Sequence, residues 1–255
     1  MKKLNLETAE ILAGKMRSEL LRVSATEPLN MKTVLRQLNV MTLYRPLSDK
    51  LFGLSLLTPD KKHRFMLVNS NSRRGRQHFT IAHELYHLYF DDESVFNVCS
   101  KSLDLNSENE KCADQFASYF LAPYKSLRAT IKKVAGDGQL SMQHVISLEQ
   151  YFGMSHLAMF WRLVSEGYLS SDALEDYSSG VMSMARHLGY DDKLYKPTPA
   201  ELQRRTYGHY LKQVEELRQK DLVSSGKIDE LLLDAFRDDI AFGLDEDDQG
   251  GEAID

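Results

Sequence analysis

Residues 80–88 read TIAHELYHL and contain the pattern His-Glu-x-x-His. If this stretch is helical, His83 and His87 lie one turn apart and project from the same face of the helix. Two neutral imidazoles at this spacing can hold one zinc ion, and Glu84, about 100° round the helix, is close enough to act on water there. Apolar neighbours on all sides predict that the helix is buried. The pattern by itself also fits a core helix whose two histidines are merely hydrogen-bonded.

A zinc site that performs hydrolysis needs three protein ligands and one open position, so a third ligand must come from another part of the chain. Residues 107–121 predict a second amphipathic helix, and Pro123 stops it. Glu110 falls on the stripe of this helix that also carries small alanines. Because small residues let another helix approach closely, we expect Glu110 to reach the histidines.

Other roles for the acidic residues remain open at this point. Glu93 and Glu108 are rival candidates for the third ligand, and Ser107-x-x-Glu110 is also a capping box, in which the glutamate would bond back to the helix start. Asp114 is either a solvated helix residue or the acceptor of a hydrogen bond from the free nitrogen of a zinc-binding histidine. We favour the ligand role for Glu110.

The two segments together resemble a known family. RQHFTIAHELYH at residues 76–87, followed by EKCADQFASYFLAP at residues 110–123, resembles the ImmA/IrrE metallopeptidases. These are bacterial zincin-like proteins, and many are encoded by mobile elements. One departure is Tyr86, where the family usually has glycine. Tyrosine is compatible with a helix, but this side chain could crowd the cleft.

The resemblance implies Zn²⁺ bound by His83, His87 and Glu110, with Glu84 as the catalytic carboxylate. It also implies a substrate, a helix-turn-helix (XRE-type) repressor or antitoxin, whose cleavage relieves repression in mobile-element or stress regulation. The alternative is a non-proteolytic zinc-binding partner of such a protein, as a paired toxin or a module that sequesters the repressor. Four side chains remain open as stabilisers of the oxyanion: Tyr86, Tyr119, Tyr124 and His78.

Three apolar runs precede the His-Glu-x-x-His stretch, at residues 40–47, 51–57 and 64–69. Turn residues separate them, which predicts a small antiparallel sheet. An exposed edge of such a sheet could hold an extended peptide by backbone hydrogen bonds. Gly53 predicts a bulge or a close backbone approach. We therefore expect an α+β, mostly helical fold with a zincin-like core, in which a small antiparallel sheet lies beside the helix that carries His-Glu-x-x-His, and a C-terminal helical region.

Helical patterns account for most of the remaining chain. They cover residues 6–22, 141–151, 156–166 and 200–220. The pair at 141–166 has helix-turn-helix spacing but an apolar second helix, so we expect no direct contact with nucleic acid. We divide the chain into four parts. These are a zincin-like metallopeptidase domain at residues 1–135, a helix-turn-helix-like helical subdomain at 136–190, a C-terminal helical region at 191–243 and a disordered acidic tail at 244–255.

Composition narrows the functional classes. The 255 residues are 42% hydrophobic and 27% charged, with a net charge of −5, which argues against tight non-specific binding to DNA or anionic membranes. Cys99 and Cys112 are too few for a disulfide framework. No apolar stretch approaches the roughly 20 residues of a membrane span. We expect a cytoplasmic protein.

Overall fold

The computed structural model describes residues 2–91, 96–100 and 108–243, and their fold is α+β and mostly helical, as predicted. The longer α-helices are α1 (Lys2–Lys15), α3 (Arg74–Phe90), α4 (Glu108–Leu121), α5 (Tyr124–Ala135), α6 (Met142–Phe152), α7 (His156–Ser165), α10 (His209–Gln219) and α11 (Ser225–Asp234). Four short α-helices are α2 (Met31–Gln37), α8 (Leu174–Ser178), α9 (Val181–His187) and α12 (Asp238–Ala241). The strands are β1 (Val40–Arg45), β2 (Leu51–Leu57), β3 (Arg64–Asn69), β4 (Phe96–Ser100) and β5 (Arg205–Gly208).

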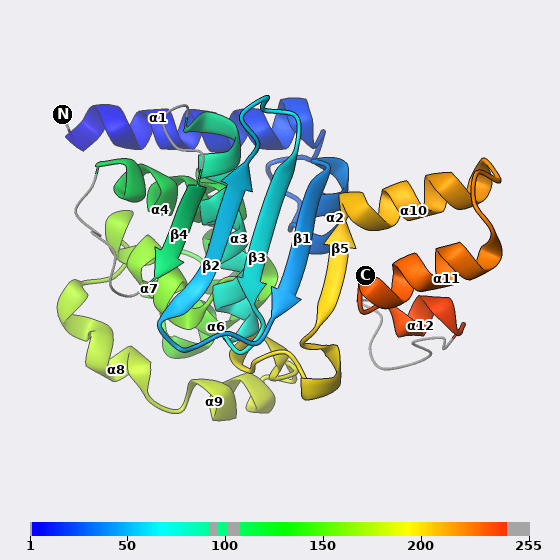
Figure 1. Cartoon of the computed structure of the whole chain (residues 1–255). Coiled ribbons are helices and arrows are strands. Elements are labelled where there is room, and N and C mark those ends of the chain that lie inside the picture. The colour runs from blue at the N-terminus through cyan, green and yellow to red at the C-terminus, as the bar shows by residue number, and fades with distance from the viewer. Residues whose placement is uncertain (1, 92–95, 101–107, 244–255) are drawn as a thin grey trace.

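The five described strands form one sheet in the order β4-β2-β3-β1-β5 (Figure 1). Strand β3 pairs antiparallel with β2 but parallel with β1. The expectation of a wholly antiparallel sheet is therefore wrong for this one pair. The physical reason is topological. Strand β2 does not pair with β1, and β3 lies between the two, parallel to β1 and antiparallel to β2.

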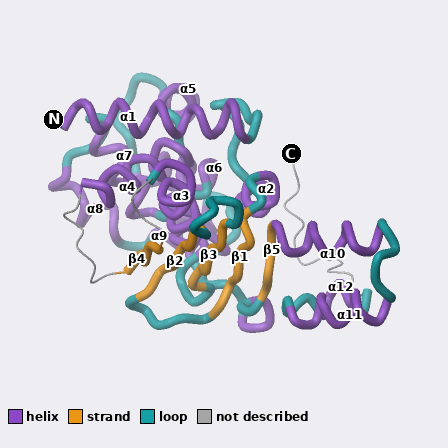
Figure 2. Tube along the Cα trace, turned by 45° about the horizontal axis from the view of Figure 1, so that its top comes forward, coloured by secondary structure: helices purple, strands orange, loops and turns teal. Residues whose placement is uncertain are grey.

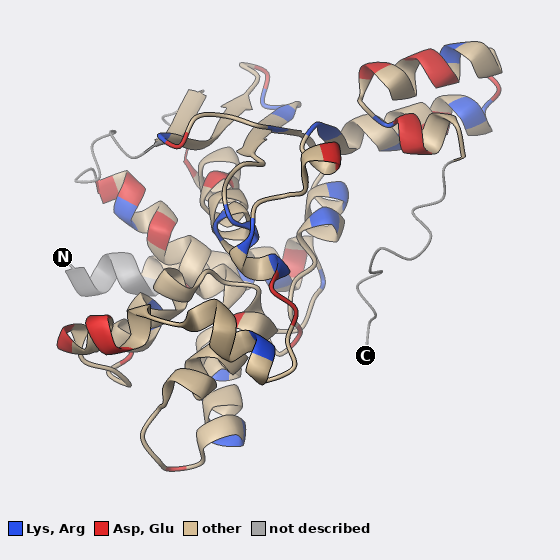
Figure 3. Ribbon diagram, turned by 90° about the horizontal axis from the view of Figure 1, so that it is seen from below, with Lys and Arg blue, Asp and Glu red and all other residues tan. Residues whose placement is uncertain are grey.

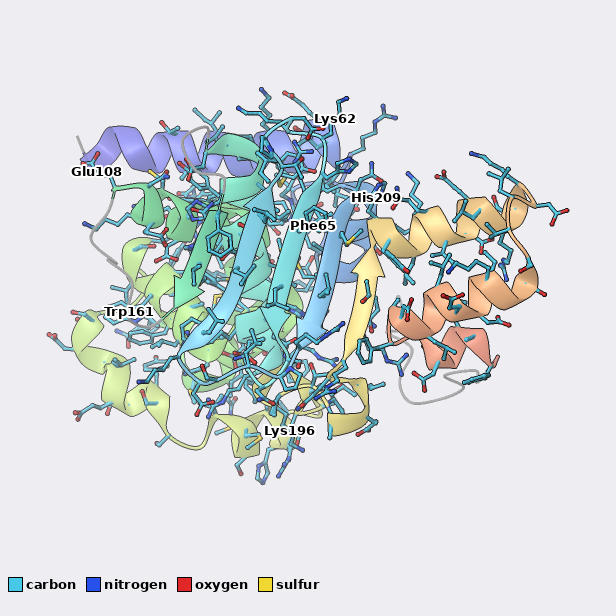
Figure 4. All side chains as sticks on the ribbon, viewed as in Figure 1. Lys62, Phe65, Glu108, Trp161, Lys196 and His209 are labelled. Carbon is cyan, nitrogen blue, oxygen red and sulfur yellow. The ribbon has the colours of Figure 1, made fainter. Side chains whose placement is uncertain are left out.

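Helix α3 packs on one face of the sheet, and the main helices lie on that side (Figures 1 and 2). Side chains alternate between the two faces of a strand. Ser55 and Leu57 are buried under the helix, whereas Phe65, on the outward face, is partly exposed (Figure 4). A Cβ on Gly53 would lie 2.7 Å from Thr80 Cγ2 of α3. The predicted close approach at Gly53 is confirmed, and the β2–β4 register shifts between Leu51 and Gly53.

Helix α4 packs against α3 through small and aromatic side chains. Ala113 and Ala117 are fully buried at this contact, and Phe116 lies beside the ring of Tyr86 with 5.8 Å between ring centroids. Alanine side chains let the two helix axes approach, as the sequence predicts. The helix ends at Leu121, two residues before the proline that was expected to stop it.

Two predicted helices have different limits in the structure. The N-terminal helix ends at Lys15 and continues as a π-helical turn over Met16–Leu20. The helix predicted over residues 200–220 is wrong in its first half, because β5 occupies part of it and α10 starts only at His209. Gly208, at φ 78°, packs against the Val40 carbonyl, and pairing with β1 buries Arg205 and Thr206. Sheet pairing here outweighs local helix propensity.

Helices α10, α11 and α12 extend from the side of the body and carry interspersed charges of both signs (Figures 2 and 3). Val214, Ile228 and Leu232 form a small hydrophobic cluster of their own. Buried residues of α6 and α7 join the main core. The division of the chain into domains stays a prediction, and the acidic tail at 244–255 lies outside the described residues. Among the described helices, none is long and apolar enough to cross a membrane.

Candidate metal centre

Three potential metal ligands converge between α3 and α4. His83 Nε2 lies 3.3 Å from His87 Nε2 and 3.2 Å from Glu110 Oε2. His87 Nε2 lies 3.4 Å from Glu110 Oε1. Bonds of about 2.0–2.1 Å to a tetrahedral zinc ion separate neighbouring ligand atoms by about 3.3–3.4 Å. The spacing of these three side chains therefore fits a zinc ion.

The placement of Glu110 follows from local structure. The glutamate stands in the first turn of α4, one turn before the alanine at the helix contact, so its side chain reaches the two imidazoles. Its rival Glu108 is exposed at the first residue of the helix (Figure 4). The other rival, Glu93, and the proposed capping residue Ser107 lie outside the described residues.

Carboxylates hold the far side of both imidazole rings. Asp114 Oδ1 lies 2.9 Å from His83 Nδ1, which is the geometry of the second of the two roles that the sequence leaves open for it. Asp91 Oδ2 lies 2.9 Å from His87 Nδ1 and is buried. When Nδ1–H donates to a carboxylate, the lone pair of Nε2 is left to bind a metal. Sequence reasoning missed Asp91, although its position four residues after His87 would place both on one helix face.

Asp91 is itself fixed by a chain of hydrogen bonds to α4. Asn109 Nδ2 donates to Asp91 Oδ2 at 2.6 Å, and the Tyr86 hydroxyl donates to Asn109 Oδ1 at 3.0 Å. Tyr86 therefore does not only fill space between the helices. It links α3 to α4 and helps to orient the aspartate behind His87.

Glu84 is fully buried beside the three ligands. Its Oε2 accepts a hydrogen bond of 2.5 Å from Ser55 Oγ on β2. Its Oε1 has no hydrogen-bond partner among the described residues. Burial raises the pKa of this carboxyl above its usual value, against the opposing effect of His83. A carboxylate with one fixed oxygen and one unengaged oxygen suits the transfer of a proton.

Burial and hydrogen bonding have opposite effects on the pKa of His83. Burial disfavours the protonated form of His83, but hydrogen bonds with Asp114 and Glu110 outweigh burial and raise its pKa to about 10. Hydrogen bonds with His83 and then His87 hold the pKa of Glu110 well below its usual range. In the metal-free protein these shifts favour a protonated His83 beside an ionised Glu110, and a metal has to displace the proton of the histidine.

Cys99 of β4 was not expected at the site. Its Sγ, a ring nitrogen of His83 and a carboxylate oxygen of Glu84 all lie within 4.8 Å of one another. Burial and the nearby negative charges of Glu84, Asp114 and Glu110 raise the pKa of this thiol. No sequence signal placed it, because β4 itself was not predicted.

The proposed oxyanion stabilisers have contacts of their own. The hydroxyl of Tyr86 is bonded to α4, and His78 Nδ1 lies 2.8 Å from the Gly153 carbonyl oxygen. The ring of Tyr119 lies 3.8 Å from Arg162 Cζ, and Tyr124 is exposed. These contacts do not select one of them.

Comparison with known proteins supplies one match. The family model for peptidase family M78, described as the IrrE N-terminal-like domain, matches residues 35–163, half of the chain. This range contains the sheet strands β1–β4, both metal-centre helices and all of the side chains described above. A search of curated proteins gave no match.

Proposed function

Because the chain belongs to the M78 family of IrrE/ImmA-type metallopeptidases, we propose that it is a zinc-dependent endopeptidase with His83, His87 and Glu110 as metal ligands. The observation that carries this proposal is the mutual spacing of 3.2–3.4 Å between the three ligand atoms. Glu84, next in sequence to one ligand, supplies the carboxylate that hydrolysis requires. Two imidazoles and one carboxylate are a ligand set typical of catalytic zinc.

A bound zinc ion would polarise the scissile carbonyl and make water a better nucleophile at neutral pH. The protein residues have separate tasks around it. Ser55 holds one oxygen of Glu84 in place, so that the other oxygen can accept the proton of the attacking water. The same carboxyl then gives this proton to the leaving amine. Because burial raises its pKa, Glu84 takes up a proton more readily than an exposed glutamate does, which favours both steps.

The substrate would bind as an extended peptide along β4. This strand is at the edge of the sheet, and its Cys99 lies beside the catalytic glutamate. No described strand pairs with the outer edge of β4. Backbone hydrogen bonds to such an edge bind a peptide largely independently of its sequence. Selectivity would then come from contacts between the two folded proteins away from the scissile bond.

We propose a helix-turn-helix repressor as that substrate, on the strength of the resemblance to ImmA/IrrE proteins. The charge of the chain is compatible with this class. A net charge of −5 favours association with a basic, DNA-binding protein over association with DNA itself.

The test is incubation of the protein with purified helix-turn-helix repressors from the genome that encodes it, followed by gel electrophoresis and mass spectrometry. The zinc-loaded protein should yield defined fragments. Glu84→Gln should retain zinc and lose cleavage, whereas His83→Ala should lose both. Undiminished cleavage by the Glu84→Gln variant would refute the catalytic role of Glu84.

A stable complex without fragments would instead support the non-proteolytic alternative. In that case the Glu84→Gln variant should bind and inactivate the repressor as well as the unmodified protein does. Equal function of the two proteins in a repressor-controlled reporter strain would identify sequestration as the mechanism.

A further inference from the structure

We propose that Phe96 and Val98 of β4 help to select the peptide that is cleaved, by favouring apolar side chains at two of its positions that are separated by one residue. This inference rests on the proposed function, in which a substrate pairs with the outer edge of β4. Backbone pairing alone carries little sequence preference. The two side chains add a local preference to the selectivity that comes from contacts between the folded proteins.

The sheet register assigns the side chains of β4 to two faces. Asn97 is paired with Ser55, whose hydroxyl donates to Glu84 at 2.5 Å. Directly paired residues have their side chains on the same face of a sheet, and successive residues of a strand alternate between the faces. Asn97 therefore lies on the face toward the metal centre. Its neighbours Phe96 and Val98 lie on the outward face.

The outward face of the sheet carries two apolar rows that end at β4. Pairing across β1, β3, β2 and β4 defines them, with Met41, Phe65, Leu56 and Phe96 in the first row and Leu43, Leu67, Leu54 and Val98 in the second. The described helices lie behind β2, β3 and β4 in the view of Figure 1. Toward the free edge the first row is open to solvent, since Leu56 is 37% exposed and Phe96 is 56% exposed. Contiguous exposed apolar surface of this kind is typical of a binding site.

A peptide strand paired with β4 would extend both rows. Neighbouring strands lie about 4.7–4.9 Å apart, so two side chains of the peptide would stand directly beside Phe96 and Val98. The residue between them would point to the face of Asn97, toward the metal centre. Apolar side chains at the two outward positions would cover apolar surface that polar side chains leave in water. A shift of one residue would turn them to the other face, so the same preference decides which peptide bonds reach the metal centre.

The test uses the full-length, zinc-loaded protein and a mixture of short randomised peptides, with the fragments identified by mass spectrometry. Apolar residues should be enriched at two positions that are separated by one residue and lie at a fixed distance from the cleaved bond. Each cross-strand pair accounts for up to about fivefold, so both positions together should change kcat/KM by about 2–25-fold. Phe96→Ser should remove the preference at one position, and Val98→Thr should remove it at the other.

Phe65→Ser is the matched control. It removes a phenylalanine from the same row and face, two strands away from the free edge (Figure 4). Both preferences should survive this change. Phe96→Leu keeps an apolar side chain at the edge and should retain the preference at its position. Circular dichroism checks the fold of each variant, and Phe96→Gln replaces the serine variant if that variant folds poorly.

The outcomes separate this inference from the proposed function. Cleavage without the alternating preference, or a preference that persists in both β4 variants, would overturn the inference and leave the endopeptidase intact. A dimer in sedimentation that Phe96→Ser and Phe65→Ser both convert to a monomer would assign the apolar face to a second copy of the chain and would also overturn it.

If no peptide in the mixture is cleaved, the repressor assay described above decides on the proposed function, and peptide binding decides on the inference. The zinc-loaded Glu84→Gln variant should bind a fluorescein-labelled peptide of alternating leucine and threonine more tightly than a peptide with the same residues in two blocks. Fluorescence anisotropy measures both affinities, and equal affinities would overturn the role of Phe96 and Val98.

Discussion

The two aspartates behind the histidines should differ strongly in their effect on metal binding. Asp91→Asn removes the charge from an acceptor whose side chain is 3% exposed and which serves both His87 Nδ1 and Asn109 Nδ2. An asparagine oxygen in the place of Oδ2 can still face both donors, but as a neutral acceptor it makes a weaker hydrogen bond to each of them. Loss of a hydrogen bond to a charged group costs about 1.5–3 kcal/mol. This corresponds to an affinity for zinc weaker by about 10–150-fold.

Asp114→Asn should have a much smaller effect. The side chain of Asp114 is 53% exposed, so water already screens its charge and can replace its hydrogen bond to His83. An exposed ion pair contributes about 0–1 kcal/mol, which amounts to a change of at most about fivefold in affinity. Both aspartates lie 2.9 Å from their histidine, so the expected difference in zinc affinity comes from burial of the aspartate and not from the distance.

The assay is competition for zinc between the protein and a chromophoric chelator, with Asp137→Asn on the exposed turn after α5 as the control. The control should bind zinc as the unmodified protein does. Thermal unfolding of each metal-free variant separates loss of fold from loss of affinity. An equal or larger effect of Asp114→Asn, or no effect of Asp91→Asn, would refute the reasoning from burial.

Three further predictions concern the surroundings of the site. Ser55→Ala removes the hydrogen bond to Oε2 of the buried Glu84, whose Oε1 has no partner among the described residues. Cleavage should slow by about 10–100-fold at unchanged zinc content, and an unchanged rate would show that the serine does not orient the base. Gly53→Ala forces a Cβ to within 2.8 Å of the Leu67 carbonyl oxygen. Urea unfolding should show that the free energy of unfolding falls by about 1–3 kcal/mol. The control Gly226→Ala, whose Cβ meets open space, should lower the free energy of unfolding far less. In the metal-free protein the pKa of His83 is raised to about 10, so its contribution to stability is fully present below the ordinary value of about 6.5 and is lost as the pH rises through about 10. Chelator-treated protein should therefore unfold at a lower temperature at high pH, and a His83→Gln variant should lack this part of the pH dependence.

The proximity of Glu110 to His83 and His87 could be predicted from sequence because it depends on helix periodicity. One turn of helix joins the two imidazoles, and one turn separates the glutamate from the alanine that lets the helices meet. Such short-range geometry is nearly the same in every α-helix. Asp114 could be placed behind His83 for the same reason.

The residues contributed by the sheet could not be predicted in this way. Ser55 and Cys99 reach the site because β2 and β4 pair in one particular register, and no local pattern sets that register. The parallel pairing of β1 with β3 and the late strand β5 depend likewise on contacts between distant parts of the chain. Asp91 was within reach of helix periodicity, since it lies four residues after His87, but as the residue that follows the last turn of the helix it gave no signal of its own.

The most direct test of the central claim is the position of the metal, determined by anomalous diffraction at the zinc absorption edge. We predict one ion bonded to Nε2 of His83, Nε2 of His87 and a carboxylate oxygen of Glu110, at distances of about 2.0–2.2 Å. An ion bound at another place, or a Glu110 side chain turned away from both imidazoles with no other acid in its position, would contradict the account.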